Sequence, residues 1–274
     1  MSEWQSTVRR LIEEAEAVVV GAGSGMSASA GLTYTGRRFR EKFSDFIERY
    51  GMTDMYSAGF YPFPTQEEKW AYWSRHIYCN RYDVPAGKPY LDLYQLVKDR
   101  NYFILTTNVD HQFQISGFDK SRLFYGMFQC AKACHKKLYE NEKEVRAMVA
   151  QQKNLKIPSE LVPKCPVCGG DMEVNLRRDR YFVEDEAWER ACAGYTGFIR
   201  QNRNRRLVFL ELGVGMNTPG IIKYPFWQLT DREKHGFYIC INQGEAWGPE
   251  EIREKSLYVN MDIAEALEAV REVM

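Results

Sequence analysis

The sequence predicts an α/β protein in which a Rossmann-like, doubly wound parallel sheet is joined to a smaller domain made of a zinc ribbon and a helical insertion. Three observations lead to this prediction. Short apolar strands alternate with helical stretches, a glycine-rich turn follows the first strand, and two cysteine pairs lie where that alternation fails, between Cys130 and about Tyr181. With 274 residues, 45% of them hydrophobic, the chain can bury one large core and a smaller module.

The first βα unit carries the glycine-rich turn. Residues 3–15 show helical spacing and lead into residues 17–20, a β-branched run typical of a buried parallel strand. The strand breaks into the sequence GAGSGMSASAG, in which glycine lets the backbone approach a pyrophosphate at a helix N-terminus. The predicted cofactor contacts in this turn are Gly21, Ala22, Gly23 and Gly25. An ordinary βα turn is the alternative, because no acidic residue clearly ends a second strand about 20 residues later.

The remaining elements continue the alternation of strands and helices. An aromatic, helical stretch after residue 37 is interpreted as an insertion that covers the nucleotide site. The predicted strands are 102–108, 206–215, 237–244 and 256–262, and the predicted helices include 43–52, 67–82, 86–99 and 262–274. The predicted Rossmann-like domain comprises 1–36, 85–124 and 182–274, and the small domain comprises the helical insertion 37–84 and the zinc-ribbon module 125–181.

Four cysteines form the predicted metal site. They stand in two close pairs separated by 30 residues, and the second pair lies in the turn Cys-Pro-Val-Cys-Gly-Gly, where glycine frees the amides to bend toward sulfur. The predicted zinc ligands are Cys130, Cys134, Cys165 and Cys168. A site filled by four sulfurs is closed, so its Zn²⁺ is expected to be structural. The alternative is a set of unrelated buried thiols. His135 is expected to be a solvated surface residue rather than a ligand.

Charge and composition exclude several classes of partner. Lys plus Arg and Asp plus Glu number 37 each, so no long-range field favours nucleic acid or an anionic membrane. No apolar run approaches the roughly 18 residues of a spanning helix, and the N-terminus does not resemble a signal peptide. Seven cysteines, an odd number, indicate metal and free thiols rather than disulfides. We therefore expect a cytoplasmic protein that binds neither nucleic acid nor membrane.

Several segments, taken in chain order, resemble the sirtuin family over roughly residues 17–265. These segments are Gly21-Ala22-Gly23, Thr106-Thr107-Asn108-Val109-Asp110, the four cysteines, Gly213-Val214-Gly215-Met216-Asn217 and Ile241-Asn242. The resemblance implies that NAD is enclosed between a Rossmann-like domain and a small domain. The further NAD-binding residues predicted on this basis are Tyr34, Thr107, Asn108, Gln129, Gly213, Val214, Gly215, Asn217 and Asn242.

Departures from the common sirtuin pattern indicate a particular branch. The usual Gly-Ile-Pro-Asp-Phe-Arg is replaced by residues 31–36, GLTYTG, and the Gln of Thr-Gln-Asn-x-Asp is replaced by Thr107. The His-Gly pair that deacylating sirtuins carry before the first zinc cysteine is absent, and Gln129 precedes Cys130 instead. These features resemble the microbial macrodomain-linked branch, class M. The resemblance implies ADP-ribosylation of a lipoylated carrier protein similar to glycine cleavage protein H, with a macrodomain protein as a possible partner that reverses the modification.

The predicted catalytic residues are Asn108, Asp110, Gln129 and Arg177. Breaking the bond between nicotinamide and ribose develops positive charge on the ribose, which the Asp110 carboxylate can stabilise while Asn108 orients a hydroxyl or the attacking group. Gln129 cannot take a proton, so deacylation, which needs a base, is expected to fail while transfer persists. The resemblance favours Arg177 over Arg178 as a contact to the cofactor or the acceptor. The alternative is that both arginines form a solvated basic patch.

Several questions stay open on the sequence alone, and one of them is whether simple NAD hydrolysis accompanies transfer when water reaches the intermediate. A deacylase is the first alternative to a transferase, and it would need His111 as a displaced base, whereas a lone loop histidine is the commoner outcome. A non-catalytic NAD sensor is the second, although a pure binder has no need of a charge stabiliser such as Asp110. Residues 135–164 are either an acceptor-docking surface or a charged helical linker.

Overall fold

The chain divides into two compact units. The computed structural model describes residues 3–124, 128–130, 134–176 and 180–273, with the backbone alone for 122–124 and 128–130. The sheet unit comprises Met1–Gly31, Pro85–Tyr125 and Arg190–Met274, and the small unit comprises Leu32–Val84 and Gly126–Glu189. Each unit is described by itself.

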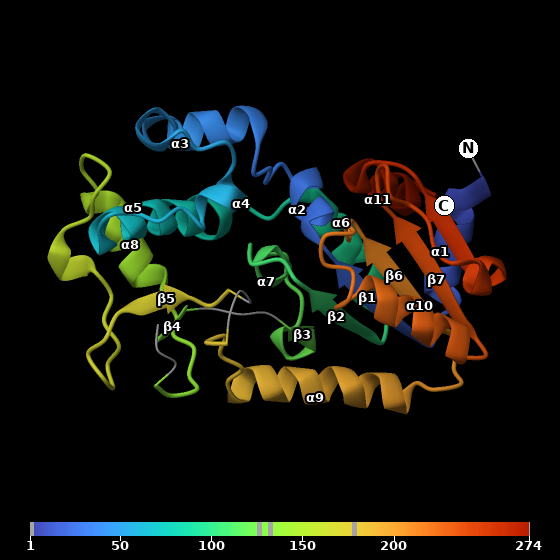
Figure 1. Ribbon diagram of the computed structural model, residues 1–274. Coiled ribbons are helices and arrows are strands. Elements are labelled where there is room, and N and C mark those ends of the chain that lie inside the picture. Colours follow the sequence, from blue (N-terminus) through green and yellow to red (C-terminus); the bar gives the residue numbers. More distant parts are fainter. Residues whose placement is uncertain (1–2, 125–127, 131–133, 177–179, 274) are drawn as a thin grey trace. The chain divides into compact units, whose positions relative to one another are not determined.

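The sheet unit is built on six parallel strands (Figure 1). The strands are β1 (Ala17–Ala22), β2 (Tyr102–Thr106), β3 (Leu123–Phe124), β6 (Leu207–Leu212), β7 (Gly236–Ile241) and β8 (Ser256–Val259). Their order is β3-β2-β1-β6-β7-β8, and every neighbouring pair is parallel. Strand order therefore reverses between β1 and β6, which is the point where doubly wound sheets bind ligands, outside the carboxyl ends of the strands. The predicted Rossmann-like fold class is confirmed.

Helices cover both faces of this sheet. Side chains of β1 alternate between two apolar clusters, with Val18 and Val20 in one and Ala17 and Val19 in the other. The first cluster includes α1 (Glu3–Glu14), α2 (Ser24–Ser29), α6 (Lys88–Val97), α7 (Gln112–Ile115) and α11 (Ile263–Glu272). The second includes α9 (Glu186–Gln201) and α10 (Lys223–Arg232). A strand buried on both faces is favoured by apolar residues on both faces, and β1 is accordingly a continuous run of small and β-branched residues.

The small unit has an aromatic core between helices and a two-stranded hairpin. Its helices are α3 (Gly36–Tyr50), α4 (Met55–Ala58), α5 (Gln66–Ile77) and α8 (Glu142–Gln151), and its hairpin pairs β4 (Phe128–Cys130) with β5 (Met172–Val174) antiparallel. The 67–82 helix ends its α-helical part at Ile77 and continues as one π-helical turn, Tyr78–Tyr82. The described residues also form three short 3-10 helices, Ser159–Leu161 in the small unit and Lys120–Arg122 and Glu250–Lys255 in the sheet unit.

Segment 135–164 contains α8, whose apolar side packs into the small unit's core through Val145 and Met148. The segment is thus at least partly structural. Within the described ranges, none of the helices combines the length and apolar character needed to span a bilayer.

Candidate active site and metal centre

Three glycines bring two loops into backbone contact at the switch point. The amide of Gly23 donates to the Leu212 carbonyl at 3.0 Å, and the amide of Gly25 donates to the Gly213 carbonyl at 2.9 Å. A Cβ on Gly23 would lie 2.6 Å from the Gly213 carbonyl oxygen, and a Cβ on Gly25 would lie 2.7 Å from the Gly213 Cα. Gly213 itself has a φ of 61°, in the left-handed region. Only glycine fits at these positions, so the loop after β1 and the loop after β6 form one continuous backbone rim.

Gly21 and Ala22 lie inside β1, just before this rim. A Cβ on Gly21 would lie 2.4 Å from the Ile222 side chain and 2.6 Å from the Phe226 ring, so its missing side chain makes room for α10. Ala22 is fully buried in the sheet core. Packing therefore supplies a sufficient reason for both residues. Their predicted contact with a cofactor stays a prediction.

Asp110 lies in the loop after β2 and is held by three hydrogen bonds. Its Oδ2 accepts from the Ser27 hydroxyl at 2.5 Å and from the Tyr90 hydroxyl at 3.0 Å, and its Oδ1 accepts from the amide of Gln112 at 3.0 Å. The side chain is only 5% exposed. Buried charge is tolerated where donors surround it, so this carboxylate is fixed in place by α2, α6 and α7.

Asn108 lies beside Asp110 and is half-buried. Its Nδ2 donates to the Gly23 carbonyl at 2.8 Å and lies 3.4 Å from the Tyr90 hydroxyl. Its backbone amide donates to the Thr106 hydroxyl at 3.0 Å. The structure thus brings Asn108 and Asp110 together with the glycine rim, at the carboxyl end of the sheet.

Two members of this cluster, Ser27 and Tyr90, were not predicted from the sequence. Ser27 stands in the glycine-rich stretch after the first strand, and this position was the only sequence signal for it. A buried serine hydroxyl needs a hydrogen-bond partner, which Asp110 supplies. Tyr90 lies in α6, and nothing in its local pattern marks it, because its partners come from other elements. Burial raises the pKa of the Tyr90 phenol well above its usual value, with the nearby Asp110 charge adding to the effect, so the phenol keeps its proton.

The other predicted residues of the sheet unit lie around the same rim. Thr107 is exposed and its amide donates to the Ala22 carbonyl at 3.3 Å. Val214 is buried, and its carbonyl accepts from Asn242 Nδ2 at 3.2 Å. Gly215 is half-buried and Asn217 is exposed. Asn242 therefore joins the end of β7 to the loop after β6, which is a structural task in addition to any contact with a ligand.

The remaining predicted site residues belong to the small unit or fall outside the described part. Tyr34 packs edge-on against the ring of His76, with centroids 5.3 Å apart, and its carbonyl accepts from the Met55 amide at 2.9 Å. The backbone of Gln129 pairs with Glu173 in the β4–β5 hairpin, but its side chain is outside the described atoms. Arg177, like Arg178, lies outside the described residues.

His111, the candidate displaced base, occupies the N-cap position of α7 with a φ of 58°. A non-glycine residue rarely adopts this left-handed conformation. His111 directly follows Asp110, and its side chain is half-buried.

Three of the four predicted zinc ligands converge in the small unit. The sulfurs of Cys134, Cys165 and Cys168 all lie within 4.8 Å of one another, and those of Cys134 and Cys165 are 3.6 Å apart. With Zn–S bonds of about 2.3 Å, two sulfurs of one tetrahedron lie about 3.8 Å apart, so the donor set fits Zn²⁺. The backbone of Cys130 pairs with Met172 in the hairpin, and its side chain is outside the described atoms.

The turn that carries Cys165 and Cys168 favours thiolate. Burial raises the pKa of the Cys165 thiol, but hydrogen bonds from the backbone amides of Cys168 and Val167 and from neighbouring cysteines outweigh it, so the pKa is lowered overall. Gly169, with a φ of 68°, allows the chain to fold back so that its amide donates to the Cys165 carbonyl at 2.8 Å. A lowered thiol pKa favours the form that binds a metal.

His135, expected from the sequence to be a solvated surface residue rather than a ligand, is partly exposed and contacts the cysteine cluster. Its Nδ1 lies 2.9 Å from the sulfur of Cys134, and its Nε2 lies 2.7 Å from the Tyr139 hydroxyl. Tyr139, four residues further along the chain, holds the ring against the sulfur. The separation of 2.9 Å is a hydrogen-bonding distance and is shorter than that between two ligands of one tetrahedral ion.

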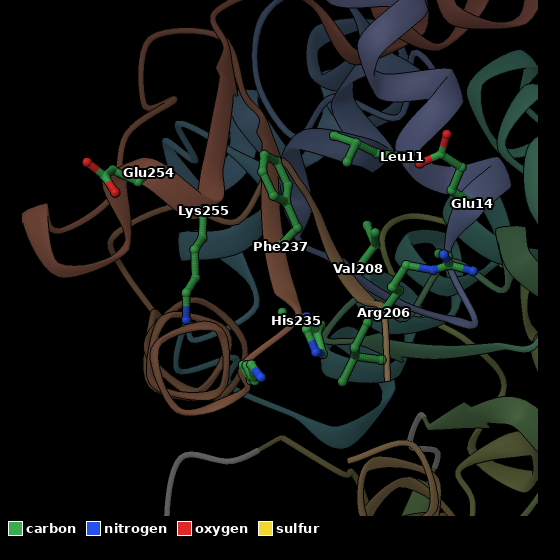
Figure 2. Close-up of a pocket in the computed structure, with 12 residues that line it drawn as sticks. Leu11, Glu14, Arg206, Val208, His235, Phe237, Glu254 and Lys255 are labelled. Carbon is green, nitrogen blue, oxygen red and sulfur yellow. The ribbon is translucent and has the colours of Figure 1, made fainter. Parts of the chain in front are cut away.

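A separate hollow of about 300 Å³ opens at the amino-terminal ends of β6 and β7 (Figure 2). Lys255 lines it, but its Nζ donates to three carbonyls near the end of α10, those of Thr230, Asp231 and Glu233, at 3.2–3.3 Å. The cation therefore satisfies a helix C-terminus rather than facing a ligand. Doubly wound sheets bind ligands at the carboxyl ends of their strands, where Asn108 and Asp110 lie. This hollow lies at the amino-terminal ends and is therefore distinct from that cluster.

Known proteins similar to the chain were identified by sequence and by structure. A protein ADP-ribosyltransferase of Staphylococcus aureus strain Mu50 is 38% identical over 263 residues, covering 94% of this chain and 84% of that protein. A probable bifunctional ADP-ribose hydrolase/ADP-ribosyltransferase of Fusarium oxysporum f. sp. cubense is 33% identical over 245 residues, covering 80% of this chain but only 39% of that protein. No family model matches the chain.

Solved Sir2 structures share the fold. One, bound to a propionylated peptide, superimposes with a TM-score of 0.62 at 18% identity and covers 99% of this chain and 98% of the other. Another, with a p53 peptide and NAD, gives a TM-score of 0.57 at 17% identity with the same coverage. At this level of identity the likeness concerns the fold.

Proposed function

We propose that this chain, which belongs to the protein ADP-ribosyltransferase family and has the sirtuin fold, transfers ADP-ribose from NAD to a protein and releases nicotinamide. The observation that carries the proposal is the Asn108–Asp110 cluster at the carboxyl end of the sheet. Its carboxylate is anchored by three donors beside the backbone rim formed by Gly23, Gly25 and Gly213, at the end of the sheet where α/β folds of this kind bind nucleotides.

The chemistry follows from the charge that the reaction develops. When the bond between the ribose C1′ and the nicotinamide nitrogen breaks, nicotinamide leaves with the bonding electrons and positive charge appears on the ribose. A fixed carboxylate, Asp110, stabilises this charge without having to reorganise. Asn108 is proposed to accept a hydrogen bond from a ribose hydroxyl. An acceptor side chain then forms the new bond to C1′ and gives up its proton, so the atoms and charges balance.

The substitution at Gln129 supports transfer over deacylation. A deacylase needs a base that takes a proton from a ribose hydroxyl, and a glutamine amide has no accessible basic form. On this proposal Gln129 contributes hydrogen bonds alone, and Arg177 contributes a fixed positive charge toward cofactor or acceptor.

The cysteine cluster is proposed to hold a structural Zn²⁺. Cys134, Cys165 and Cys168 supply three sulfurs, and Cys130 is assigned as the fourth ligand from its place in the β4–β5 hairpin. Four sulfur ligands leave no open coordination position, so the metal would stabilise the small unit without taking part in the reaction.

The acceptor is proposed to be a lipoylated carrier protein resembling glycine cleavage protein H. This part of the proposal rests on the match of the chain's motifs to the macrodomain-linked branch. The Fusarium relative is named as joining an ADP-ribose hydrolase to the transferase, which supports a partner that removes the modification.

The test incubates the purified protein with NAD and a lipoylated carrier while following carrier mass and free nicotinamide, with an acetylated peptide in parallel. We expect the carrier to gain the mass of one ADP-ribose and the peptide to stay acetylated. Asn108→Ala should abolish the gain, whereas Asn101→Ala, at the opposite end of β2, should preserve it. Deacetylation without an adduct would refute the transferase proposal. An adduct on the unlipoylated carrier as well would show that the acceptor does not need lipoate.

A further inference from the structure

Tyr90 lies at the centre of the cluster that holds the two candidate catalytic residues. It is in the first turn of α6, has no exposed surface, and packs edge-on against Phe113 with ring centroids 4.9 Å apart at 84°. This ring packing alone would be served equally well by phenylalanine. The hydroxyl therefore requires a separate explanation.

The hydroxyl reaches three polar groups that belong to other elements. It lies 3.0 Å from Asp110 Oδ2, 3.4 Å from Asn108 Nδ2 and 3.4 Å from the Ser27 hydroxyl. Burial raises the pKa of the phenol well above its usual value, so it stays protonated and can donate one hydrogen bond. The Asp110 carboxylate accepts this hydrogen bond, as it also accepts one from the Ser27 hydroxyl at 2.5 Å.

This direction of donation fixes the orientation of Asn108. With its proton committed to Asp110, the oxygen of Tyr90 can only accept from the Asn108 amide. One hydrogen of Asn108 Nδ2 points to the Gly23 carbonyl at 2.8 Å and the other to Tyr90. Both hydrogens are then used within the protein, and Oδ1 is the atom that Asn108 presents to a ligand. A flipped amide would place an oxygen against two acceptors.

From this geometry we infer that Tyr90 is a positioning residue, which holds the Asn108 amide and the Asp110 carboxylate in the one arrangement suited to NAD cleavage. The inference about catalysis rests on the proposed function, whereas the inference about orientation stands on the contacts. Among the described residues Ser27 contacts Asp110 and Tyr90 but not Asn108, so it supports the carboxylate directly and Asn108 only by way of Tyr90. Tyr90 contacts both catalytic candidates.

The first experiment tests orientation without reference to activity. The side-chain amide signals of Asn108 are recorded in a nitrogen-15 spectrum and assigned by their loss in Asn108→Ala. Tyr90→Phe keeps the ring and removes the hydroxyl, and we expect the Asn108 amide signals to shift and exchange with solvent faster. The matched control is Tyr94→Phe, the same change one turn along α6, where the ring packs on Phe118 with centroids 5.1 Å apart. It should leave those signals in place.

The second experiment measures nicotinamide release from NAD, with and without acceptor. Tyr90→Phe should lower kcat about tenfold to a hundredfold, as expected for loss of a hydrogen bond to a charged group that orients a reacting site, while KM for NAD changes by less than about twofold. Tyr94→Phe should match the unmodified protein. A loss confined to KM, or equal kcat in both variants, would overturn the catalytic part of the inference.

The two experiments separate failure of this inference from failure of the proposed function. If the unmodified protein releases no nicotinamide under any condition, the proposed function fails, and the nitrogen-15 spectra still decide whether Tyr90 orients Asn108. Unchanged Asn108 signals in Tyr90→Phe would overturn the inference even if the protein proves to be an efficient transferase.

Discussion

At the scale of single residues, burial decides which polar groups are available for chemistry. Asp110 and His76 are both buried, but their surroundings differ. Asp110 meets donors from α2, α6 and α7, which suit a carboxylate. His76 lies among aromatic rings, with Tyr34 and Trp73 centroids at 5.3 and 5.1 Å. Burial, and then the positive charge of Arg38 and Arg81, lowers its pKa from 6.5 to about 3. His76 is therefore a neutral packing residue at neutral pH, and its protonation in acid should destabilise the folded state.

This shift makes the stability of the small unit depend on pH. The folded pKa of His76 lies below the unfolded value, so between pH 6.5 and 3 the unfolded chain binds more protons than the folded one. The stabilisation is complete above pH 6.5 and is lost as the pH falls. At pH 5 the loss is about 2 kcal/mol.

Urea unfolding between pH 5 and 8 measures this dependence. His76→Gln, which cannot titrate, should flatten the dependence of the unfolding free energy on pH, even if it lowers the free energy at pH 8. His235→Gln, at an exposed histidine of the hollow in Figure 2, serves as the control and should keep the slope. An unaltered slope in His76→Gln would show that other groups cause the acid sensitivity.

At the scale of elements, a buried ion pair joins β6 to α10 beneath the loop that carries Gly213. Lys223 Nζ lies 2.7 Å from Glu211 Oε1, and the Tyr238 hydroxyl donates to Glu211 Oε2 at 2.6 Å. Both members of the pair have no exposed surface. Since Glu211 comes near the end of β6 and Lys223 begins α10, the pair ties together the two ends of the loop 213–222.

Removing one member of this pair should lower the free energy of unfolding markedly, whereas replacing both members by uncharged residues should lower it much less. Lys223→Met leaves a buried, partly compensated carboxylate, and we expect it to lower the free energy of unfolding by about 3–5 kcal/mol. The double variant Glu211→Gln with Lys223→Met removes both charges and should recover most of that loss. Thermal and urea unfolding of the single and double variants measure the difference.

An exposed ion pair provides the comparison. Arg253 and Glu250 lie 3.0 Å apart with 70% and 78% of their side chains exposed, so Arg253→Met should leave the free energy of unfolding nearly unchanged. If the double variant at 211 and 223 were as unstable as Lys223→Met alone, packing rather than uncompensated charge would explain the loss.

At the scale of the whole molecule, the two units are stabilised in different ways. The sheet unit buries apolar strands on both faces, with helices on each side. The small unit packs an aromatic core against a short hairpin. Cys165, from the cysteine cluster, and Met172, from the hairpin, are both part of that core. Loss of the proposed Zn²⁺ would therefore disturb the core and not only the turn.

Metal removal should unfold the small unit selectively. After treatment with a chelator, hydrogen exchange is expected to rise by at least about tenfold in α8 and the β4–β5 hairpin, while β1, β6 and β7 keep their protection. Cys168→Ser should reproduce this effect. Cys192→Ser, at a cysteine outside the cluster, should not. Equal loss of protection in both units, or none in either, would contradict a structural metal confined to the small unit.

Much of the fold could be predicted because its signals are local. Strands β1, β2, β6, β7 and β8 overlap the predicted apolar runs, since strands packed between two layers of helices are largely apolar. The short strands β3, β4 and β5 have two or three residues each and leave too little pattern to detect. The site was predictable only in part. Asn108 and Asp110 stand together in the sequence, but Ser27 and Tyr90 join them through contacts over 83 and 20 residues.

The sequence by itself determined the strand–glycine turn–helix order, the cysteine spacing and the absence of a basic residue at Gln129, because each depends on residue types at short separation. Only the tertiary structure decided which groups surround those residues. It placed Gly23 and Gly25 against Gly213, Tyr90 between Asn108 and Asp110, and His135 on a cysteine sulfur. Hydrogen bonding and burial depend on neighbours brought together by packing, and a local pattern carries no information about them.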